Sequence, residues 1–184
     1  MQTHTFDLII RGGTLLTMSA DMQIIEDGIV GIMGNRIELV EKNIQPDADK
    51  VIRADGCLVM PGLVNTHAHL PMVCFRGLAD DLTLMDWLEN HIFPMEARFV
   101  DKIMAHDGAM LAIAEMILSG TTTVCDGYFF ENHIARAIQS CGMRTVVAQG
   151  FADFATPDNP DHEKMMAVAE RFAERWKQHA PLVT

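Results

Sequence analysis

From residue 58 onward the sequence alternates short apolar, β-prone runs with longer amphipathic stretches, and this alternation most constrains the fold. The runs CLVMPGLVNTH, TTTVCDGYF and MRTVVAQGF have the composition of buried strands. Helical periodicity, with apolar residues three and four apart, follows them over residues 96–120, 131–142 and 161–180. Repetition of this kind predicts right-handed βαβ crossovers and a parallel sheet, so the predicted fold class is α/β.

The first part of the chain has a different pattern. Residues 6–55 contain short β-prone runs separated by turn residues, with Gly12-Gly13 and Gly34-Asn35 as hairpin candidates. A polar loop over residues 43–50 separates two of these runs. The pattern predicts a small β-rich subdomain over residues 1–57 and a separate α/β unit over residues 58–184.

Charge and composition exclude several classes of partner. The 25 acidic residues exceed the 14 Lys and Arg residues, so a net charge of −11 leaves no basic stripe for nucleic acid. The N-terminus lacks a basic start followed by an apolar signal segment, and no apolar run reaches membrane-spanning length. The cysteines are widely spaced, which predicts reduced core thiols in a cytoplasmic protein: Cys57, Cys74, Cys125 and Cys141.

Two histidines, His67 and His69, stand at the predicted carboxyl end of the first parallel strand. Because side chains alternate faces along a strand, residues i and i+2 point the same way and their imidazoles can hold one cation. Neutral imidazole suits zinc, iron or nickel. The alternative is that both residues are polar caps at a strand end. A catalytic zinc normally takes three protein ligands, so further ligands must come from elsewhere.

Three other residues are candidates with structural alternatives. Glu96 follows Pro94 at a predicted helix start, where the helix dipole and unpaired amides also favour a carboxylate. Trp87 lies on an amphipathic stretch, where core packing competes with a role in a cavity wall. Asp126 ends the second predicted strand, at the height of the candidate site, although a turn residue is an equally good interpretation.

Residues 56–96 closely resemble the amidohydrolase superfamily. The motif PGLVNTHAHLP is followed by RGLADDL and by W-L-x(5)-P-x-E, and the resemblance extends to LIIRGGTLLTM and GTTTVCDGYF. It is strongest for the branch of methylthioadenosine/S-adenosylhomocysteine deaminases, with chlorotriazine hydrolases and guanine deaminases as relatives. The resemblance implies a metal-dependent (β/α)8 barrel preceded by a small β-sandwich subdomain.

The resemblance also implies roles for individual residues. His67 and His69 match the first two ligands of one divalent metal, most often zinc, with iron or nickel as alternatives. Glu96 matches the glutamate that binds the ribose hydroxyls of nucleoside substrates. The family's remaining ligands and proton-transfer residues come from later strands, so no catalytic residue is expected here. The chain therefore resembles the N-terminal portion of an enzyme, with the first three βα units of the barrel and a fourth strand starting at APLVT, and we expect it to be inactive alone.

The implied reaction is hydrolytic deamination of a purine nucleoside-type substrate such as methylthioadenosine or S-adenosylhomocysteine. Gln149 stands where some relatives have an arginine, which favours the uncharged methylthioadenosine because an amide cannot pair with a carboxylate-bearing tail. The alternatives are a chlorotriazine or guanine-type ring hydrolase, or a non-catalytic α/β module. The expected partners are a small-molecule substrate and further copies of the chain, since an open sheet exposes an edge.

Overall fold

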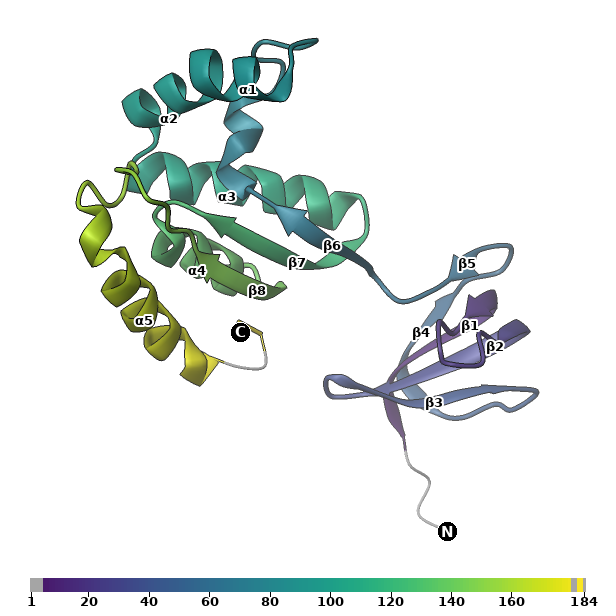
Figure 1. Ribbon diagram of the computed structural model, residues 1–184. Helices are drawn as coiled ribbons and strands as arrows, with labels where there is room; N and C mark the ends of the chain where they lie inside the picture. Colours follow the sequence, from purple (N-terminus) through teal and green to yellow (C-terminus); the bar gives the residue numbers. More distant parts are fainter. Residues whose placement is uncertain (1–4, 180–181, 184) are drawn as a thin grey trace. The chain divides into compact units, whose positions relative to one another are not determined.

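The computed structural model describes residues 5–179 and 182–183, and the chain divides into two compact units between Pro61 and Gly62 (Figure 1). The expected boundary followed residue 57. The division falls later because Leu58 and Val59 form a short strand that pairs in parallel with the first strand of the chain. These two residues therefore belong to the N-terminal unit.

The described residues of the N-terminal unit form a five-stranded sheet. Its strands are β1 (Phe6–Leu16), β2 (Ile24–Met33), β3 (Arg36–Lys42), β4 (Ala48–Arg53) and β5 (Leu58–Val59). The order is β3-β2-β1-β4, and β5 extends the sheet beside the far end of β1. Ile9 and Leu15 on β1, with Ile29 on β2, are buried and form the core of this unit.

One of the two predicted hairpins is correct. Gly34 and Asn35 form a two-residue turn between the antiparallel strands β2 and β3, and Gly34 takes the positive φ of 58° that such turns require. The prediction for Gly12-Gly13 is wrong, because both residues lie inside β1. The register against β2 shifts on either side of Gly13, and Gly12 has a φ of 89°, so the pair forms a strand irregularity.

The C-terminal unit is built on a parallel sheet, as the alternation predicts. Its strands are β6 (Leu63–Ala68), β7 (Thr121–Tyr128) and β8 (Arg144–Gln149), in the order β6-β7-β8. Its helices are α1 (Leu84–Trp87), α2 (Phe93–Phe99), α3 (Lys102–Leu118), α4 (Glu131–Ser140) and α5 (Met165–Trp176). A 3-10 turn, Leu70–Phe75, follows β6, and a π-helical turn, Leu88–Ile92, joins α1 to α2.

The hydrophobic core lies between this sheet and the helices α3, α4 and α5 (Figure 1). Val124 on β7 and Val147 on β8 belong to this core. They meet Ile113 on α3, Ile134 on α4 and Phe172 on α5, all of which are buried. Because the three strands are parallel, their carboxyl ends lie at one edge of the sheet.

The first predicted strand, CLVMPGLVNTH, is divided in the structure. Pro61 and Gly62 separate β5 from β6, because proline has no amide to donate to a ladder and glycine weakens a strand interior. The expectation that β6 is covered on both faces is also wrong for the described chain. Leu63 and Val64 are 50% and 57% exposed, since α3 and α4 pack against the neighbouring strands.

The single helix predicted over residues 96–120 is two helices. Val100 has an extended ψ of 111° and ends α2, and Asp101 starts α3. The Asp101 carboxylate accepts hydrogen bonds from the amides of Ile103 and Met104 at 2.9 and 2.8 Å, which caps the new helix. The break allows α2 and α3 to run in different directions.

Three smaller predictions concern the fourth strand, the cysteines and membrane-spanning segments. Val183 forms an isolated parallel bridge with Thr145, as a fourth strand beside β8 would begin, and residues 180, 181 and 184 of that predicted strand lie outside the described residues. All four cysteines are free, but Cys57 and Cys74 are exposed because they lie in surface turns, so the prediction of core thiols fails for these two. No described helix is long and apolar enough to span a bilayer.

Candidate metal centre and adjoining cavity

His67 and His69 lie together at the carboxyl end of β6. Their rings are 5.1 Å apart at an angle of 78°, and their Nε2 atoms are 3.4 Å apart. Two nitrogen ligands of a tetrahedral zinc, each about 2.05 Å from the ion, are separated by about 3.3 Å. The pair predicted from the i, i+2 spacing therefore has the separation needed to hold one such cation.

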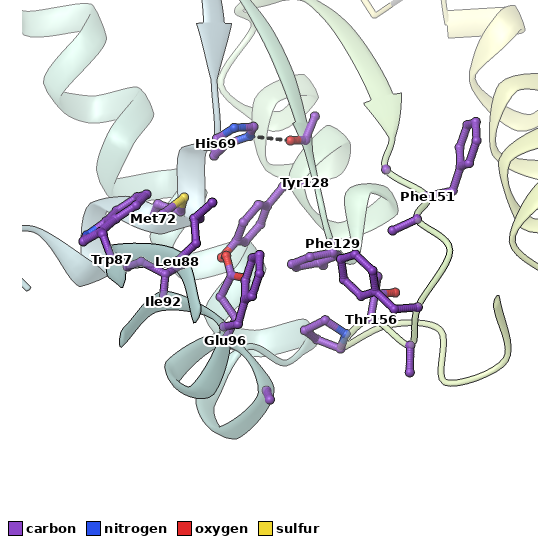
Figure 2. Close-up of a pocket in the computed structure, with 18 of the residues that line it drawn as sticks. His69, Met72, Trp87, Leu88, Ile92, Glu96, Tyr128, Phe129, Phe151 and Thr156 are labelled. Atoms are coloured by element: carbon purple, nitrogen blue, oxygen red, sulfur yellow. Dashed lines mark hydrogen bonds between the residues drawn. The ribbon is translucent and has the colours of Figure 1, made fainter. Parts of the chain in front are cut away.

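A backbone carbonyl of β7 orients His69. The His69 Nδ1 atom is 2.6 Å from the carbonyl oxygen of Gly127, and a carbonyl can only accept, so Nδ1 carries the proton (Figure 2). The lone pair is then on Nε2, the atom that faces His67. Metal-binding histidines commonly have their second nitrogen fixed in this way, which selects the tautomer and the ring orientation.

No third ligand joins the two histidines within the described residues. No group of three or more His, Cys, Asp or Glu side chains among residues 5–179 and 182–183 is arranged to hold a metal. Two imidazoles are fewer than the three protein ligands usual for catalytic zinc. The described residues therefore offer two nitrogen ligands to a candidate metal site, called the metal half-site below, and further ligands would be needed to complete it.

Asp126 is part of the support for this site. It lies within β7 and is only 3% exposed, and its Oδ1 accepts a hydrogen bond from the amide of Leu70, the residue after His69, at 2.7 Å. Its Oδ2 is buried without a hydrogen-bond partner among the described residues. Burial raises the pKa of Asp126 to about 7. Neither sequence interpretation, a turn residue or a group in the site, anticipated this bond between strand ends.

A second buried carboxyl, Glu131, stands close to Asp126 at the start of α4. Its Oε2 accepts a hydrogen bond from the amide of Tyr128 at 3.0 Å, while its Oε1 is buried and unpartnered among the described residues. Burial raises the pKa of Glu131 well above its usual range, and the charge of Asp126 raises it further. Sequence reasoning missed Glu131, and its only signal was a carboxylate placed directly after an apolar strand end.

Glu96 is buried beside the same edge of the sheet and pairs with Tyr128. The Tyr128 hydroxyl donates a hydrogen bond to Glu96 Oε1 at 2.7 Å, and both residues are 5% exposed. Burial raises the pKa of Glu96, and the hydrogen bond from Tyr128 partly opposes this rise. Tyr128, the single tyrosine of the sequence, was missed because nothing in its local pattern indicated a partner 32 residues away.

A cavity of about 860 Å³ adjoins His69, Glu96 and Tyr128 (Figure 2). His69 and Glu96 are on its wall, and most of the remaining lining is apolar or aromatic. The lining includes Leu84, Trp87, Leu88, Ile92, Phe93, Tyr128, Phe129, Phe151 and Phe154. Trp87, for which core packing was the default interpretation, lines the cavity and donates its indole N–H to the Leu78 carbonyl at 3.3 Å. Such a cavity can enclose a flat heteroaromatic ring.

The loop after β8 carries a negative charge near the cavity and holds Gln149. The Gln149 amide donates to Asp158 Oδ2 at 2.8 Å, and Asp158 also accepts from the amide of Phe130 and the hydroxyl of Thr156. No Lys or Arg is among the described residues that line the cavity. In this part of the chain, the wall therefore offers no cation to a carboxylate-bearing ligand.

Comparison with known proteins places this architecture in a family. The amidohydrolase family profile matches residues 58–184. A 5-methylthioadenosine/S-adenosylhomocysteine deaminase of Syntrophus aciditrophicus is 43% identical over 174 residues, which are 92% of this chain and 39% of that protein. A 5'-deoxyadenosine deaminase of Methanosarcina mazei is 39% identical over 171 residues, 93% and 39% of the two chains.

Solved structures share this fold. An adenosine deaminase of Xanthomonas campestris with bound zinc superimposes with a TM-score of 0.89 and 32% identity, covering 98% of this chain and 42% of that one. An atrazine chlorohydrolase of Arthrobacter aurescens complexed with zinc shares the fold, with a TM-score of 0.83, 22% identity and coverage of 96% and 45%. The chain spans about two fifths of the length of the curated relatives it matches. The chain belongs to the amidohydrolase family.

Proposed function

We propose that the full-length protein is a metal-dependent hydrolase that deaminates purine nucleoside-type substrates, and that His67 and His69 are two of its metal ligands. The observation that carries this proposal is the 3.4 Å separation of the two Nε2 atoms beside a largely apolar cavity that also contains a buried carboxylate. The deaminase names of relatives about 40% identical to the chain support the reaction class.

We infer that the C-terminal unit supplies the first three βα units of a (β/α)8 barrel, preceded by the N-terminal unit as part of a small β-rich domain. The parallel order β6-β7-β8 and the bridge from Val183 to Thr145 support this architecture. Active sites of such barrels lie at the carboxyl ends of the strands, where His67 and His69 lie. The remaining ligands and the proton-transfer residues then belong to later strands.

We propose the following division of roles within the described residues. When bound, the metal would supply a water molecule of near-neutral pKa as the nucleophile for the amine-bearing ring carbon. The Gly127 carbonyl orients His69, and Asp126 fixes the backbone beside it through the Leu70 amide. The aromatic wall encloses the ring and excludes bulk water, and Glu96 accepts hydrogen bonds from the ribose hydroxyls.

We further propose that the preferred substrates are uncharged beyond the ribose, such as 5'-methylthioadenosine or 5'-deoxyadenosine. Gln149 is held by Asp158, and the described part of the cavity wall contains no cation. A substrate that ends in an amino-acid carboxylate would place this group near the Asp158 charge without a counterion. S-adenosylhomocysteine should therefore be a poorer substrate than 5'-methylthioadenosine.

Ammonia release from the full-length, zinc-loaded protein tests the proposal. The substrate panel is 5'-methylthioadenosine, 5'-deoxyadenosine, S-adenosylhomocysteine, guanine and a chlorinated triazine, each with and without a chelator. We expect chelator-sensitive ammonia release from the first two. His67→Ala should abolish it, whereas His106→Ala, which changes a partly exposed histidine paired with Asp107, should leave it unchanged. Release of chloride or deamination of guanine alone would contradict the nucleoside assignment, and no turnover of any substrate would favour a non-catalytic module.

A further inference from the structure

Tyr128 contacts both halves of the candidate site. Its hydroxyl donates to Glu96 Oε1 at 2.7 Å, and its ring centre is 5.9 Å from that of His69, with the two planes inclined by 35°. On the side of the cavity wall, its ring lies 4.9 Å from that of Phe129. Figure 2 shows the tyrosine extending from the end of β7 between His69 and Glu96. It is therefore the side chain that links the metal half-site to the carboxylate.

The backbone of Tyr128 is held on two sides. Tyr128 is the last residue of β7 and pairs with Gln149 of β8. Its amide donates to Oε2 of Glu131, a side chain with no exposed surface. The strand end and the start of α4 hold the backbone of Tyr128, and its ring is almost fully buried, so the hydroxyl has a defined place in the cavity wall.

This contact divides the two oxygens of Glu96 between different tasks. Oε1 accepts a hydrogen bond from the Tyr128 hydroxyl. Oε2 has no hydrogen-bond partner among the described residues, and it is not among the fully buried polar atoms that lack one. Glu96 lines the cavity, so Oε2 is the oxygen available to a ligand. The donated hydrogen bond also favours the ionised carboxylate, which is the stronger acceptor for hydroxyl groups.

We propose that Tyr128 is a positioning residue that sets selectivity for the ribose by orienting Glu96 so that Oε2 receives the sugar hydroxyls. This inference rests on the proposed nucleoside deaminase function. Tyr128 is not assigned a chemical step. It acts through Glu96, and its effect should appear only with substrates that carry the hydroxyls.

The first test measures KM and kcat of the full-length enzyme for adenosine and for 2',3'-dideoxyadenosine, whose ratio of KM values defines the ribose preference. Tyr128→Phe keeps the ring and removes the hydroxyl. We expect it to raise KM for adenosine about tenfold, because the hydrogen bond that orients the Glu96 carboxylate is lost. KM for the dideoxy compound, which lacks the hydroxyls, should change little. The control Thr145→Val removes another buried hydroxyl, which donates to the Val124 carbonyl outside the cavity, and should not alter the preference. An equal effect of Tyr128→Phe on both substrates would overturn the inference.

A second test remains decisive if Tyr128→Phe is unstable with Glu96 present. In Glu96→Gln, keeping the hydrogen bond that the Tyr128 hydroxyl donates requires the amide oxygen at the place of Oε1. The amide nitrogen then faces the cavity, and the ribose preference should fall. Adding Tyr128→Phe to Glu96→Gln frees the amide to turn, and the preference should then rise. A fall or no change in the double variant would refute the positioning role. An inactive wild-type enzyme would refute the proposed function instead, so the two failures are distinguishable.

Discussion

Replacing Asp126 with asparagine should weaken the pH dependence of stability, because Asp126 is a buried carboxyl whose pKa is raised. The side chain is almost fully buried, its Oδ1 accepts from the Leu70 amide, and its Oδ2 has no partner among the described residues. Glu131, whose pKa the charge of Asp126 raises, is another buried carboxyl and cannot neutralise Asp126. Asparagine keeps the acceptor for Leu70 and removes the charge.

The size of the effect follows from the pKa of Asp126, which burial raises from 3.8 to about 7. The native state then binds this proton more tightly than the unfolded state does, so stability is lost as pH rises from about 4 through 7. Each pKa unit is worth about 1.4 kcal/mol, which gives a total of about 4 kcal/mol, of which about 2.5 kcal/mol falls between pH 5 and pH 8.

Urea denaturation of the metal-free protein at pH 5 and pH 8 measures this effect. The wild type should lose about 2.5 kcal/mol more than Asp126→Asn between the two pH values, because the variant has no charge to bury at this position. Asp49→Asn, which removes an exposed carboxylate of β4, should follow the wild type. Parallel losses in the wild type and Asp126→Asn would refute the conclusion that an uncompensated carboxylate lies under the metal half-site.

Two further substitutions test the packing that supports the site. Asp101→Ala removes the cap of α3 and should lower the free energy of unfolding by about 1 kcal/mol in urea denaturation, whereas Asp101→Asn should retain most of it; equal losses would contradict the capping role. Gly108→Ala would stabilise an isolated helix by about 1 kcal/mol. In this structure, however, the added Cβ would lie 2.9 Å from the Pro71 Cα atom. We expect a net loss of about 1–3 kcal/mol by the same assay, and a stabilised variant would show that α3 and the turn after β6 are not in tight contact.

The sequence predicted the parts of the site that depend on local periodicity. Strand alternation places His67 and His69 on one face, and the βαβ pattern places that strand end at the carboxyl edge of the parallel sheet. Gly34 and Asn35 were predictable for the same reason, since a two-residue turn has a local composition signal. Gly12 and Gly13 carry the same signal inside a strand, so local composition alone does not separate a turn from an irregular strand.

The contacts that complete the site join distant parts of the chain and had no local signal. Tyr128 and Glu96 are 32 residues apart, and Asp126 and Leu70 are 56 residues apart. Each pair joins a residue of β7 to a segment that follows β6, so sequence spacing could not reveal it. The break at Val100 was the exception, because Asp101 before an apolar helical run is a recognisable capping signal that the continuous periodicity obscured.

The metal content of the full-length protein tests whether His67 and His69 hold one metal ion. Elemental analysis after zinc loading and desalting should find about one zinc per chain in the wild type and in His106→Ala, as expected for a single site. His67→Ala and His69→Ala should each retain far less, with the thermal melt confirming that each variant is folded. Undiminished zinc in folded His67→Ala and His69→Ala proteins would contradict the claim.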